Sequence, residues 1–379
     1  MHNELIPFNR PYLSGDEFYN INLAIKKGQL SGDGFFTKKC HEWLENIDKN
    51  NIKKALLTHS CTASLEMSAI LCDINLGDEF ILPSFTFVST ANAFVLRGGK
   101  PVFVDIREDT LNIDESLIEK SITKRTKAIV VVHYAGVPCE MDIIIDIAKR
   151  HGLIVVEDAA QGLLSKYKNQ PLGTIGDIGC FSFHETKNIT CGEGGAILIN
   201  NEKFIKKAEI IREKGTNRTN FIKGEVDKYS WIDIGSSYLP GELNAAFLFA
   251  QMEKAEYITN QRLLLWNNYN KMLNPKKQFS TPFIPLHCKH NGHMFYLINK
   301  SSRSRNTIIS NLKANNIHCV FHYLPLHSSP FIKNNFTTDN KFLPVTDFIS
   351  NNIIRIPFWI GLEDASQKYI VSQILSEFY

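Results

Sequence analysis

The chain has 379 residues, of which 44% are hydrophobic and 21% are charged. At roughly 150 residues per domain, this length predicts two or three domains, and the composition excludes disordered, collagen-like and coiled-coil proteins. Lys plus Arg number 42 and Asp plus Glu number 39, which gives a net charge of +3. A nearly neutral chain offers no general reason to expect nucleic acid or an anionic membrane as a partner.

The eight cysteines include no C-x-x-C pair. The first residues lack the basic and apolar regions of a signal peptide, and no apolar run approaches the roughly 20 residues that a membrane span needs. Free thiols in a reducing compartment are the simplest account of such cysteines. We therefore expect a cytoplasmic protein.

Between residues 50 and 200, short apolar runs alternate with amphipathic stretches. Strands that are apolar throughout and separated by helices predict a mainly parallel sheet covered on both faces, which is an α/β fold. The expected helices are 62–74, about 90–97 and 141–152, and the expected strands are 54–60, 78–83, 101–106, 127–134, 153–158, 180–184 and 194–200.

The pattern changes after residue 200. A helix is expected at 203–215, a polar loop at 216–240 and one long helix at 242–273, which contains no Gly or Pro. We predict a large α/β domain over residues 1–250, followed by a hinge helix and a smaller α+β domain over 251–379. The smaller domain is expected to contain strands at 294–299 and 318–323 and a helix around 305–315.

The parallel sheet suggests nucleotide binding, but the chain has neither G-x-G-x-x-G in its first βα unit nor G-x-x-x-x-G-K-[ST] anywhere. The sequence therefore argues against a dehydrogenase or a P-loop enzyme. The first strand-to-helix junction instead carries small hydroxylic residues at 60–64. Such a helix start can bind a phosphate through backbone N–H groups, or it can be a plain N-cap formed by Ser60 or Thr62.

Two charged residues lie where open α/β sheets hold their ligands. Asp158 ends a buried strand, where it is either an N-cap or a carboxylate that pairs with a cationic group. Lys187 lies in a compact polar loop between a strand and the glycines of 192–195. Most lysines are solvated surface charges, but these surroundings can lower the pKa of an amine and make it a Schiff-base nucleophile.

Motifs in this order resemble the DegT/StrS-type sugar-nucleotide aminotransferases, which are fold-type I enzymes that use pyridoxal 5'-phosphate (PLP). The similarity covers nearly the whole chain. The motifs that carry it are the TAS turn at 62–64, PSFTFVSTANA, VVEDAAQG, FSFHETKN and GEGGA, together with IPFNRP, SGDG and HYLPLH. Within the family, FHETKN, REKGTNR and DIGSSYLPGELNAA resemble the dTDP-4-amino-4,6-dideoxygalactose transaminases of cell-surface polysaccharide synthesis.

The resemblance implies roles at individual positions. Lys187 would bind PLP covalently and later shuttle a proton, and Asp158 would pair with the protonated pyridine nitrogen. Phe85 would stack on the ring face. Donors to the phosphate and to the ring's 3'-oxygen would come from Thr62, Ala63, Ser182 and Gln161.

The same resemblance predicts a homodimer with shared sites. Many relatives send an Asn from the neighbouring subunit to the cofactor phosphate. The aligned residue here is Ser237, which is shorter and can still donate a hydrogen bond. Arg218 lies in a loop where a cation could meet a nucleotide diphosphate. We further expect substrate contacts from His184, Glu185, Asn188, His322 and Tyr323.

The substrates implied by the resemblance are L-glutamate and dTDP-4-dehydro-6-deoxy-D-glucose, aminated at C4. Amination at C3, or of a UDP-linked sugar, is the alternative within the family. A PLP-dependent sugar dehydratase would carry His in place of Lys187, and a non-catalytic paralogue would be expected to lose Lys187 or Asp158. The His and Cys residues between 287 and 293 resemble metal ligands, but their spacing would separate them across both faces of a strand, so no metal is expected.

Overall fold

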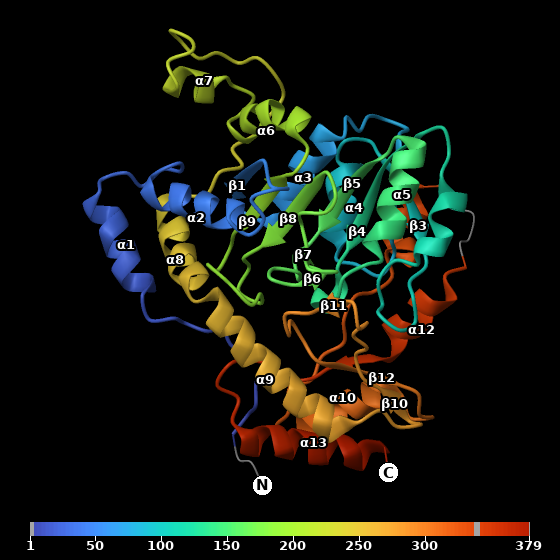
Figure 1. Ribbon diagram of the computed structural model, residues 1–379. Coiled ribbons are helices and arrows are strands. Elements are labelled where there is room, and N and C mark those ends of the chain that lie inside the picture. The colour runs from blue at the N-terminus through green and yellow to red at the C-terminus, as the bar shows by residue number, and fades with distance from the viewer. Residues whose placement is uncertain (1–3, 337–341, 379) are drawn as a thin grey trace.

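The computed structural model describes residues 4–336 and 342–378. A seven-stranded sheet forms the centre of its larger part (Figure 1). All of its strands are parallel except β9, which is antiparallel to both of its neighbours. In spatial order the strands are β1 (Lys54–Thr58), β9 (Gly195–Ile199), β8 (Ile178–Ser182), β5 (Ile154–Asp158), β4 (Thr126–Val132), β2 (Glu79–Pro83) and β3 (Lys100–Val104).

Helices cover both faces of this sheet, because alternate strand residues supply two separate apolar layers. In β4, Ile129 and Val131 belong to one buried cluster and Val130 to the other. The first cluster includes residues of α2 (Phe35–Glu45), α5 (Met141–His151) and α8 (Glu242–Glu253). The second includes residues of α3 (Cys61–Leu71), α4 (Val88–Val95) and α6 (Ile205–Arg212). The predicted α/β architecture is thus confirmed.

A smaller part lies at the far end of the molecule, where Figure 1 places both chain termini. It contains a three-stranded antiparallel sheet of β10 (Phe279–Ser280), β12 (Tyr296–Asn299) and β13 (Ile353–Arg355). The sheet packs with α10 (Arg305–Ala314) and α13 (Asp364–Phe378) around a core of its own. The remaining elements are α1 (Glu17–Lys26), α7 (Arg218–Ile222), α11 (Pro330–Asn335), α12 (Pro344–Asn352), β6 (Lys166–Tyr167), β7 (Gln170–Pro171) and β11 (Cys288–Lys289).

Two predictions about the second half of the chain are wrong in detail. The helix expected at 242–273 is interrupted at Lys254, so α8 ends and α9 (Ala255–Leu273) begins as a separate helix. The break has a packing reason, because α8 packs on α1 and α2 whereas α9 packs on α13 of the smaller part. The strand expected at 318–323 forms a single bridge between Val320 and Arg355 and otherwise lines a cavity.

Helix α7 and its flanking loops project from the body beyond α6 (Figure 1). This arm, residues 213–237, contains the polar loop expected from the sequence. It begins and ends at a bridge between Glu213 and Ser237. Large apolar side chains on the arm are exposed, and Trp231 is 80% exposed.

Candidate active site

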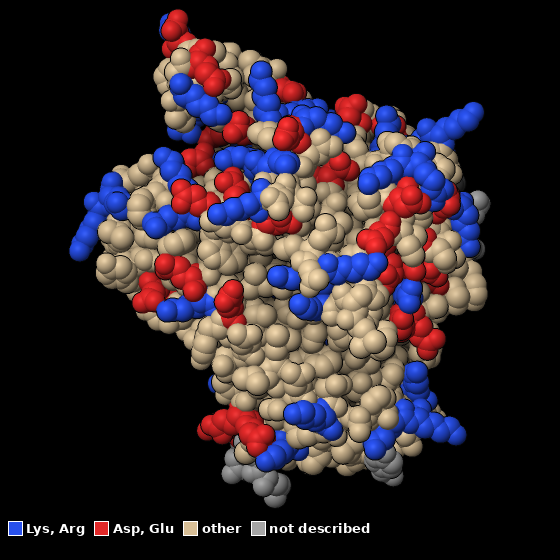
Figure 2. All heavy atoms as spheres, in the orientation of Figure 1, with Lys and Arg blue, Asp and Glu red and all other residues tan. Residues whose placement is uncertain are grey.

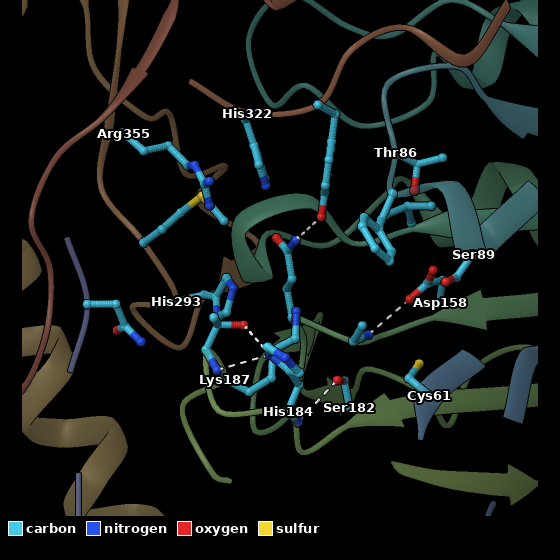
Figure 3. A pocket seen from close by; sticks show the side chains of 18 of the residues that line it. Cys61, Thr86, Ser89, Asp158, Ser182, His184, Lys187, His293, His322 and Arg355 are labelled. Atoms are coloured by element: carbon cyan, nitrogen blue, oxygen red, sulfur yellow. Dashed lines mark hydrogen bonds between the residues drawn. The ribbon is translucent and has the colours of Figure 1, made fainter. Parts of the chain in front are cut away.

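A cavity of about 700 Å³ opens where β5 and β8 end (Figure 3). The carboxyl ends of parallel strands are the usual ligand site of an open α/β sheet. Its walls combine segments that are far apart in the chain, from both the larger and the smaller part. The lining residues are Phe8, Asn9, Ser60, Cys61, Thr62, Leu65, Thr86, Phe87, Ser89, Val132, Asp158, Ala160, Gln161, Ser182, His184, Thr186, Lys187, Glu193, Gly194, Arg262, His293, Met294, Val320, Phe321, His322, Tyr323, Arg355 and Phe358.

Lys187 reaches the cavity from the connection between β8 and the antiparallel β9. The backbone folds back on itself here, because Phe183 N–H donates to Gly194 O at 2.8 Å and Cys191 N–H donates to Phe183 O at 2.9 Å. Lys187 N–H donates to His184 O at 2.9 Å, which fixes the start of the side chain. Burial lowers the pKa of the Lys187 amine. A larger share of neutral amine makes this lysine a better nucleophile.

Asp158 is the last residue of β5 and its side chain is buried. Thr90 donates its hydroxyl to Oδ2 at 2.7 Å, and Ala160 N–H donates to Oδ1 at 3.2 Å. The second bond resembles an N-cap, but a regular helix does not follow. Burial raises the pKa of the Asp158 carboxyl, and the hydrogen bonds and the amine of Lys187 oppose that rise.

The start of α3 presents hydroxyl groups and a positive helix end to the cavity. Ser60 is the N-cap, and its side chain accepts a hydrogen bond from Ala63 N–H at 3.1 Å. Thr62 donates its hydroxyl to Ser89 Oγ at 2.9 Å. A Cβ at Gly195 would overlap the backbone of the Ser60–Cys61 junction, so β9 and this turn approach closely only because the residue is glycine.

Gln161 is held in one orientation. Ala135 N–H donates to Gln161 Oε1 at 2.6 Å, so the amide nitrogen must be the atom that donates toward Tyr323 Oη, 2.8 Å away. Tyr323 stacks on His322 with ring centroids 3.6 Å apart. The hydroxyl of Tyr134 in turn lies 2.6 Å from His322 Nδ1. One side of the cavity is therefore a fixed network of amide, phenol and imidazole groups.

Residues 13–375 match the DegT/DnrJ/EryC1/StrS aminotransferase family. The chain belongs to this family. It is 36% identical to the uncharacterized protein MJ1066 of Methanocaldococcus jannaschii over 99% of this chain and 98% of that protein. It is 30% identical to the spore coat polysaccharide biosynthesis protein SpsC of Bacillus subtilis over 98% and 97%.

Two solved structures of similar proteins superpose over almost the whole chain. Helicobacter pylori PseC, an aminotransferase of pseudoaminic acid biosynthesis, has a TM-score of 0.90 at 26% identity and covers 99% of each chain. Spr1654 of Streptococcus pneumoniae, solved in a PLP form, has a TM-score of 0.89 at 25% identity and covers 98% of each chain. The protein is a PLP-dependent sugar aminotransferase.

The donor set of the cavity fits PLP, which carries an aldehyde, a ring nitrogen, a ring hydroxyl and a phosphate. A primary amine of lowered pKa, a buried carboxylate and a helix start with hydroxyl groups all face one space. Of the predicted contact residues, eight line it: Thr62, Asp158, Gln161, Ser182, His184, Lys187, His322 and Tyr323.

Phe85 is not at the cavity surface. Its ring is 1% exposed and packs among Tyr134, His322 and Tyr323. Phe87, two residues later, lines the cavity and is 56% exposed. The structure therefore does not place Phe85 where it could stack on a ligand, and it offers Phe87 instead. Both residues belong to the same PSFTF motif, and the sequence alone did not distinguish the buried ring from the exposed one.

The other predicted contacts lie outside the cavity wall. Ala63 already uses its N–H for the Ser60 cap, and Glu185 points to solvent. Asn188 is buried behind Lys187, where it bonds His293 Nδ1 at 3.0 Å. Arg218 forms an ion pair with Glu213 at 2.7 Å and Ser237 is exposed, both on the arm.

Several lining residues were missed by the sequence analysis. Arg262, His293 and Arg355 come from the smaller part of the fold, and only the three-dimensional packing brings them to the strand ends. Among the described residues, no group of His, Cys, Asp or Glu could hold a metal ion. The same described ranges contain no helix that is long and apolar enough to span a membrane.

Proposed function

We propose that the protein transfers the amino group of L-glutamate to C4 of dTDP-4-dehydro-6-deoxy-D-glucose, giving dTDP-4-amino-4,6-dideoxy-D-galactose. The observation that carries this proposal is the joint presence of Lys187 and Asp158 in one cavity with the N-terminus of α3, a helix start that can donate to a phosphate. The choice of sugar is supported by the FHETKN, REKGTNR and DIGSSYLPGELNAA segments. The name of SpsC, a spore coat polysaccharide biosynthesis protein, also points to a cell-surface sugar, and we infer a role in O-antigen, enterobacterial common antigen or a related lipopolysaccharide.

PLP, when bound, supplies an aldehyde for the amino group and a ring that withdraws electrons from it. Asp158 would keep a proton on the ring nitrogen, since an ionised carboxylate favours the charged pyridinium. Thr62 and Ser182 would donate to the phosphate, and the Gln161 amide to the ring oxygen. Phe87 would cover one face of the ring.

Lys187 is the proposed general base and acid. Its amine takes a proton from the α-carbon of glutamate and later returns one to C4 of the sugar. The lowered pKa of Lys187 favours the neutral form that the first of these steps needs.

We also propose a cytoplasmic homodimer with shared sites. The cytoplasmic location is supported by the eight cysteines, all of which are free thiols. The dimer is supported by the arm, which exposes Phe221, Ile222, Tyr229 and Trp231. Exposed apolar groups of this kind mark a protein interface, and twofold dimers are the commonest soluble assemblies. In such a dimer, Ser237 and Arg218 would serve the partner's cavity.

The test is incubation of the holoenzyme with L-glutamate and a panel of dTDP- and UDP-linked keto sugars, followed by NMR of the amino sugar. The proposal expects a new amino group at C4 of the dTDP sugar in the galacto configuration. Amination at C3, or of the UDP sugars alone, would replace the proposed substrate. Loss of a hydroxyl without transfer of nitrogen would indicate a dehydratase.

A further inference from the structure

His293 lies on the cavity wall and contacts the residue that follows Lys187. Its Nδ1 is 3.0 Å from Oδ1 of Asn188, and both residues are more than nine-tenths buried. Figure 3 shows the imidazole on the same side of the cavity as Lys187. The contact therefore joins the smaller part of the fold to the loop that carries the lysine.

The hydrogen bonds around Asn188 determine which ring nitrogen of His293 carries the proton. Asn188 Nδ2 donates to Asn291 O at 3.0 Å, so the atom that faces His293 is the amide oxygen, which can only accept. Nδ1 must therefore be the donor. In a neutral imidazole the other nitrogen, Nε2, then has a lone pair and no hydrogen. Among the described residues Nε2 has no hydrogen-bond partner, and it is the ring nitrogen left for the cavity.

The surroundings of His293 keep its ring neutral. Arg262 donates from Nη2 to His293 O at 2.6 Å and from Nε to Gly292 O at 3.0 Å, which fixes the backbone and brings a cation close to the ring. Arg355 lines the same cavity. In the part of the chain that the structure describes, no Asp or Glu pairs with the ring. Burial lowers the pKa of His293, and Lys187 and the two arginines add to the lowering.

A neutral imidazole with a free acceptor selects among the chemical groups of the substrates. Ionised carboxylates and phosphates only accept hydrogen bonds, so neither the carboxylates of glutamate nor the diphosphate of the sugar nucleotide can bind Nε2. The amine of glutamate is the group that is transferred. The remaining donors are the hydroxyl groups of the sugar and the N3–H of thymine. The diphosphate separates thymine from the reacting carbon, whereas the C3 hydroxyl is on the carbon next to it.

We propose that His293 Nε2 accepts a hydrogen bond from the C3 hydroxyl of the keto sugar and so holds the neighbouring C4 carbonyl within reach of Lys187. The inference deepens the proposed function and rests on it for the identity of the sugar. His293 is then a specificity residue of the second half of the reaction, because a sugar without this hydroxyl leaves a buried acceptor unsatisfied. Asn188 sets the direction of that acceptor.

One substitution removes Nε2 and preserves the bond to Asn188. His293→Asn keeps a side-chain donor near the position of Nδ1 and takes the acceptor out of the cavity. The matched control is His290→Asn, because His290 belongs to the same segment, is partly buried and lies outside the cavity wall. Its Nδ1 accepts a hydrogen bond from Gly292 N–H at 3.3 Å instead.

The experiment follows each half of the reaction separately through the absorbance of the bound cofactor. With dTDP-4-dehydro-6-deoxy-D-glucose, His293→Asn should raise the apparent dissociation constant roughly tenfold. With glutamate, the same variant should behave like wild type. The 3-deoxy analogue of the keto sugar should bind wild type roughly tenfold more weakly and lose nothing further in His293→Asn, since the contact is already missing. His290→Asn should match wild type in all three measurements.

Calorimetry with the holoenzyme gives a readout that needs no turnover. The unreactive dTDP-6-deoxy-D-galactose keeps the C3 hydroxyl, and dTDP lacks the sugar. His293→Asn should weaken binding of the first roughly tenfold and leave that of dTDP unchanged. If His293→Asn does not fold, His293→Gln and His293→Met are compared instead, because the two side chains are similar in length and only Gln offers an oxygen acceptor. The Met variant should then bind the sugar nucleotide more weakly than the Gln variant.

Unchanged binding of the sugar nucleotides by folded His293→Asn, or equal binding by the Gln and Met variants, would overturn the inference. An equal slowing of the glutamate half would also overturn it, since Nε2 would then serve the freed amine of Lys187. A wild-type enzyme whose aminated cofactor is not consumed by this keto sugar would instead overturn the proposed function, independently of any His293 variant.

Discussion

Thr90 donates its hydroxyl hydrogen to Asp158 Oδ2 at 2.7 Å, and the Thr86 hydroxyl lies 2.8 Å from that of Thr90. Because the single hydrogen of Thr90 goes to the carboxylate, Thr86 must donate to Thr90. The two threonines thus direct donors toward a buried carboxyl whose pKa is raised by its burial. We expect catalysis to need the negative charge at this position and folding not to need it.

We expect Asp158→Asn to lower the turnover rate by roughly two or more orders of magnitude, about 3 kcal/mol of transition-state stabilisation. The amide keeps the shape of the side chain but cannot stabilise a protonated ring nitrogen. Steady-state kinetics of the reconstituted variant provide the measurement. A loss below about threefold would mean that Asp158 acts only as a cap of the segment after β5.

The same substitution should not destabilise the apoprotein at neutral pH. The pKa of Asp158 is raised in the folded state, so the folded protein binds this proton more tightly than the unfolded chain does. Any stability from that proton is present at low pH and lost as the pH rises through the raised pKa. The asparagine carries no charge at either pH. Denaturant unfolding of the apoproteins should therefore show Asp158→Asn at least as stable as wild type near neutral pH.

Lys187→Ala should abolish turnover, because no other amine of the FHETKN motif lines the cavity. The half-buried side chain contributes little to the core, so the variant should fold and bind PLP without a covalent bond. Borohydride treatment followed by mass spectrometry should fix PLP to wild type and not to the variant. Activity like that of wild type in Lys187→Ala would contradict the proposed mechanism as a whole.

The two phenylalanines of the PSFTF motif should have different functions. Phe87→Ala should weaken PLP binding by about 1 kcal/mol, roughly fivefold, through loss of ring contact. Its effect on unfolding should be small, since the ring is 56% exposed. Phe85→Ala should instead cost about 3–5 kcal/mol of unfolding free energy, because it empties a buried aromatic cluster. If Phe85→Ala weakened PLP binding in titrations and Phe87→Ala lowered the unfolding free energy in urea, the ring-stacking role would belong to Phe85, as the sequence predicted.

Part of the fold and of the site could be predicted from the sequence. Apolar strands alternating with helices predicted the sheet, and the end of a buried strand marked Asp158, because both features follow from local pattern. Arg355 carries no such local signal. It reaches the cavity only because β13 pairs with β12 in the smaller part, far along the chain from Lys187. The break at Lys254 was missed for a similar reason, since two packing surfaces rather than a Gly or Pro impose it.

The rate at which the apoprotein takes up PLP should depend on pH through the pKa of the Lys187 amine. Burial lowers the pKa of its amine, and Arg355 adds to the lowering. As the pH falls through this lowered pKa, the amine becomes protonated and covalent uptake of PLP by the apoprotein should slow. In Arg355→Gln the nearby positive charge is gone, so the pKa of Lys187 should rise and the whole profile should move to higher pH. Stopped-flow absorbance of PLP binding across a pH series makes the comparison, and an unchanged profile in Arg355→Gln would show that the two groups do not interact.

The last prediction concerns the arm that carries Ser237. Ser237 is exposed on its own subunit and lies outside the cavity wall that contains Lys187. If the arm completes the partner's site, Lys187→Ala and Ser237→Trp should each be inactive as pure proteins. Ser237→Ala, which removes only the hydroxyl, should be the milder matched variant.

Mixed dimers of Lys187→Ala and Ser237→Trp test whether the arm of one subunit completes the site of its partner. In each heterodimer one site combines the intact Lys187 of one subunit with the intact Ser237 of the other, while the second site lacks both. A heterodimer should therefore recover about half of the wild-type activity. Differently tagged chains, refolded together and purified through both tags, provide the sample, and its turnover provides the measurement. Full activity in dissociated monomers, or an inactive sample in which heterodimers are demonstrably present, would show that each chain completes its own site and that the exposed apolar groups of the arm serve another contact.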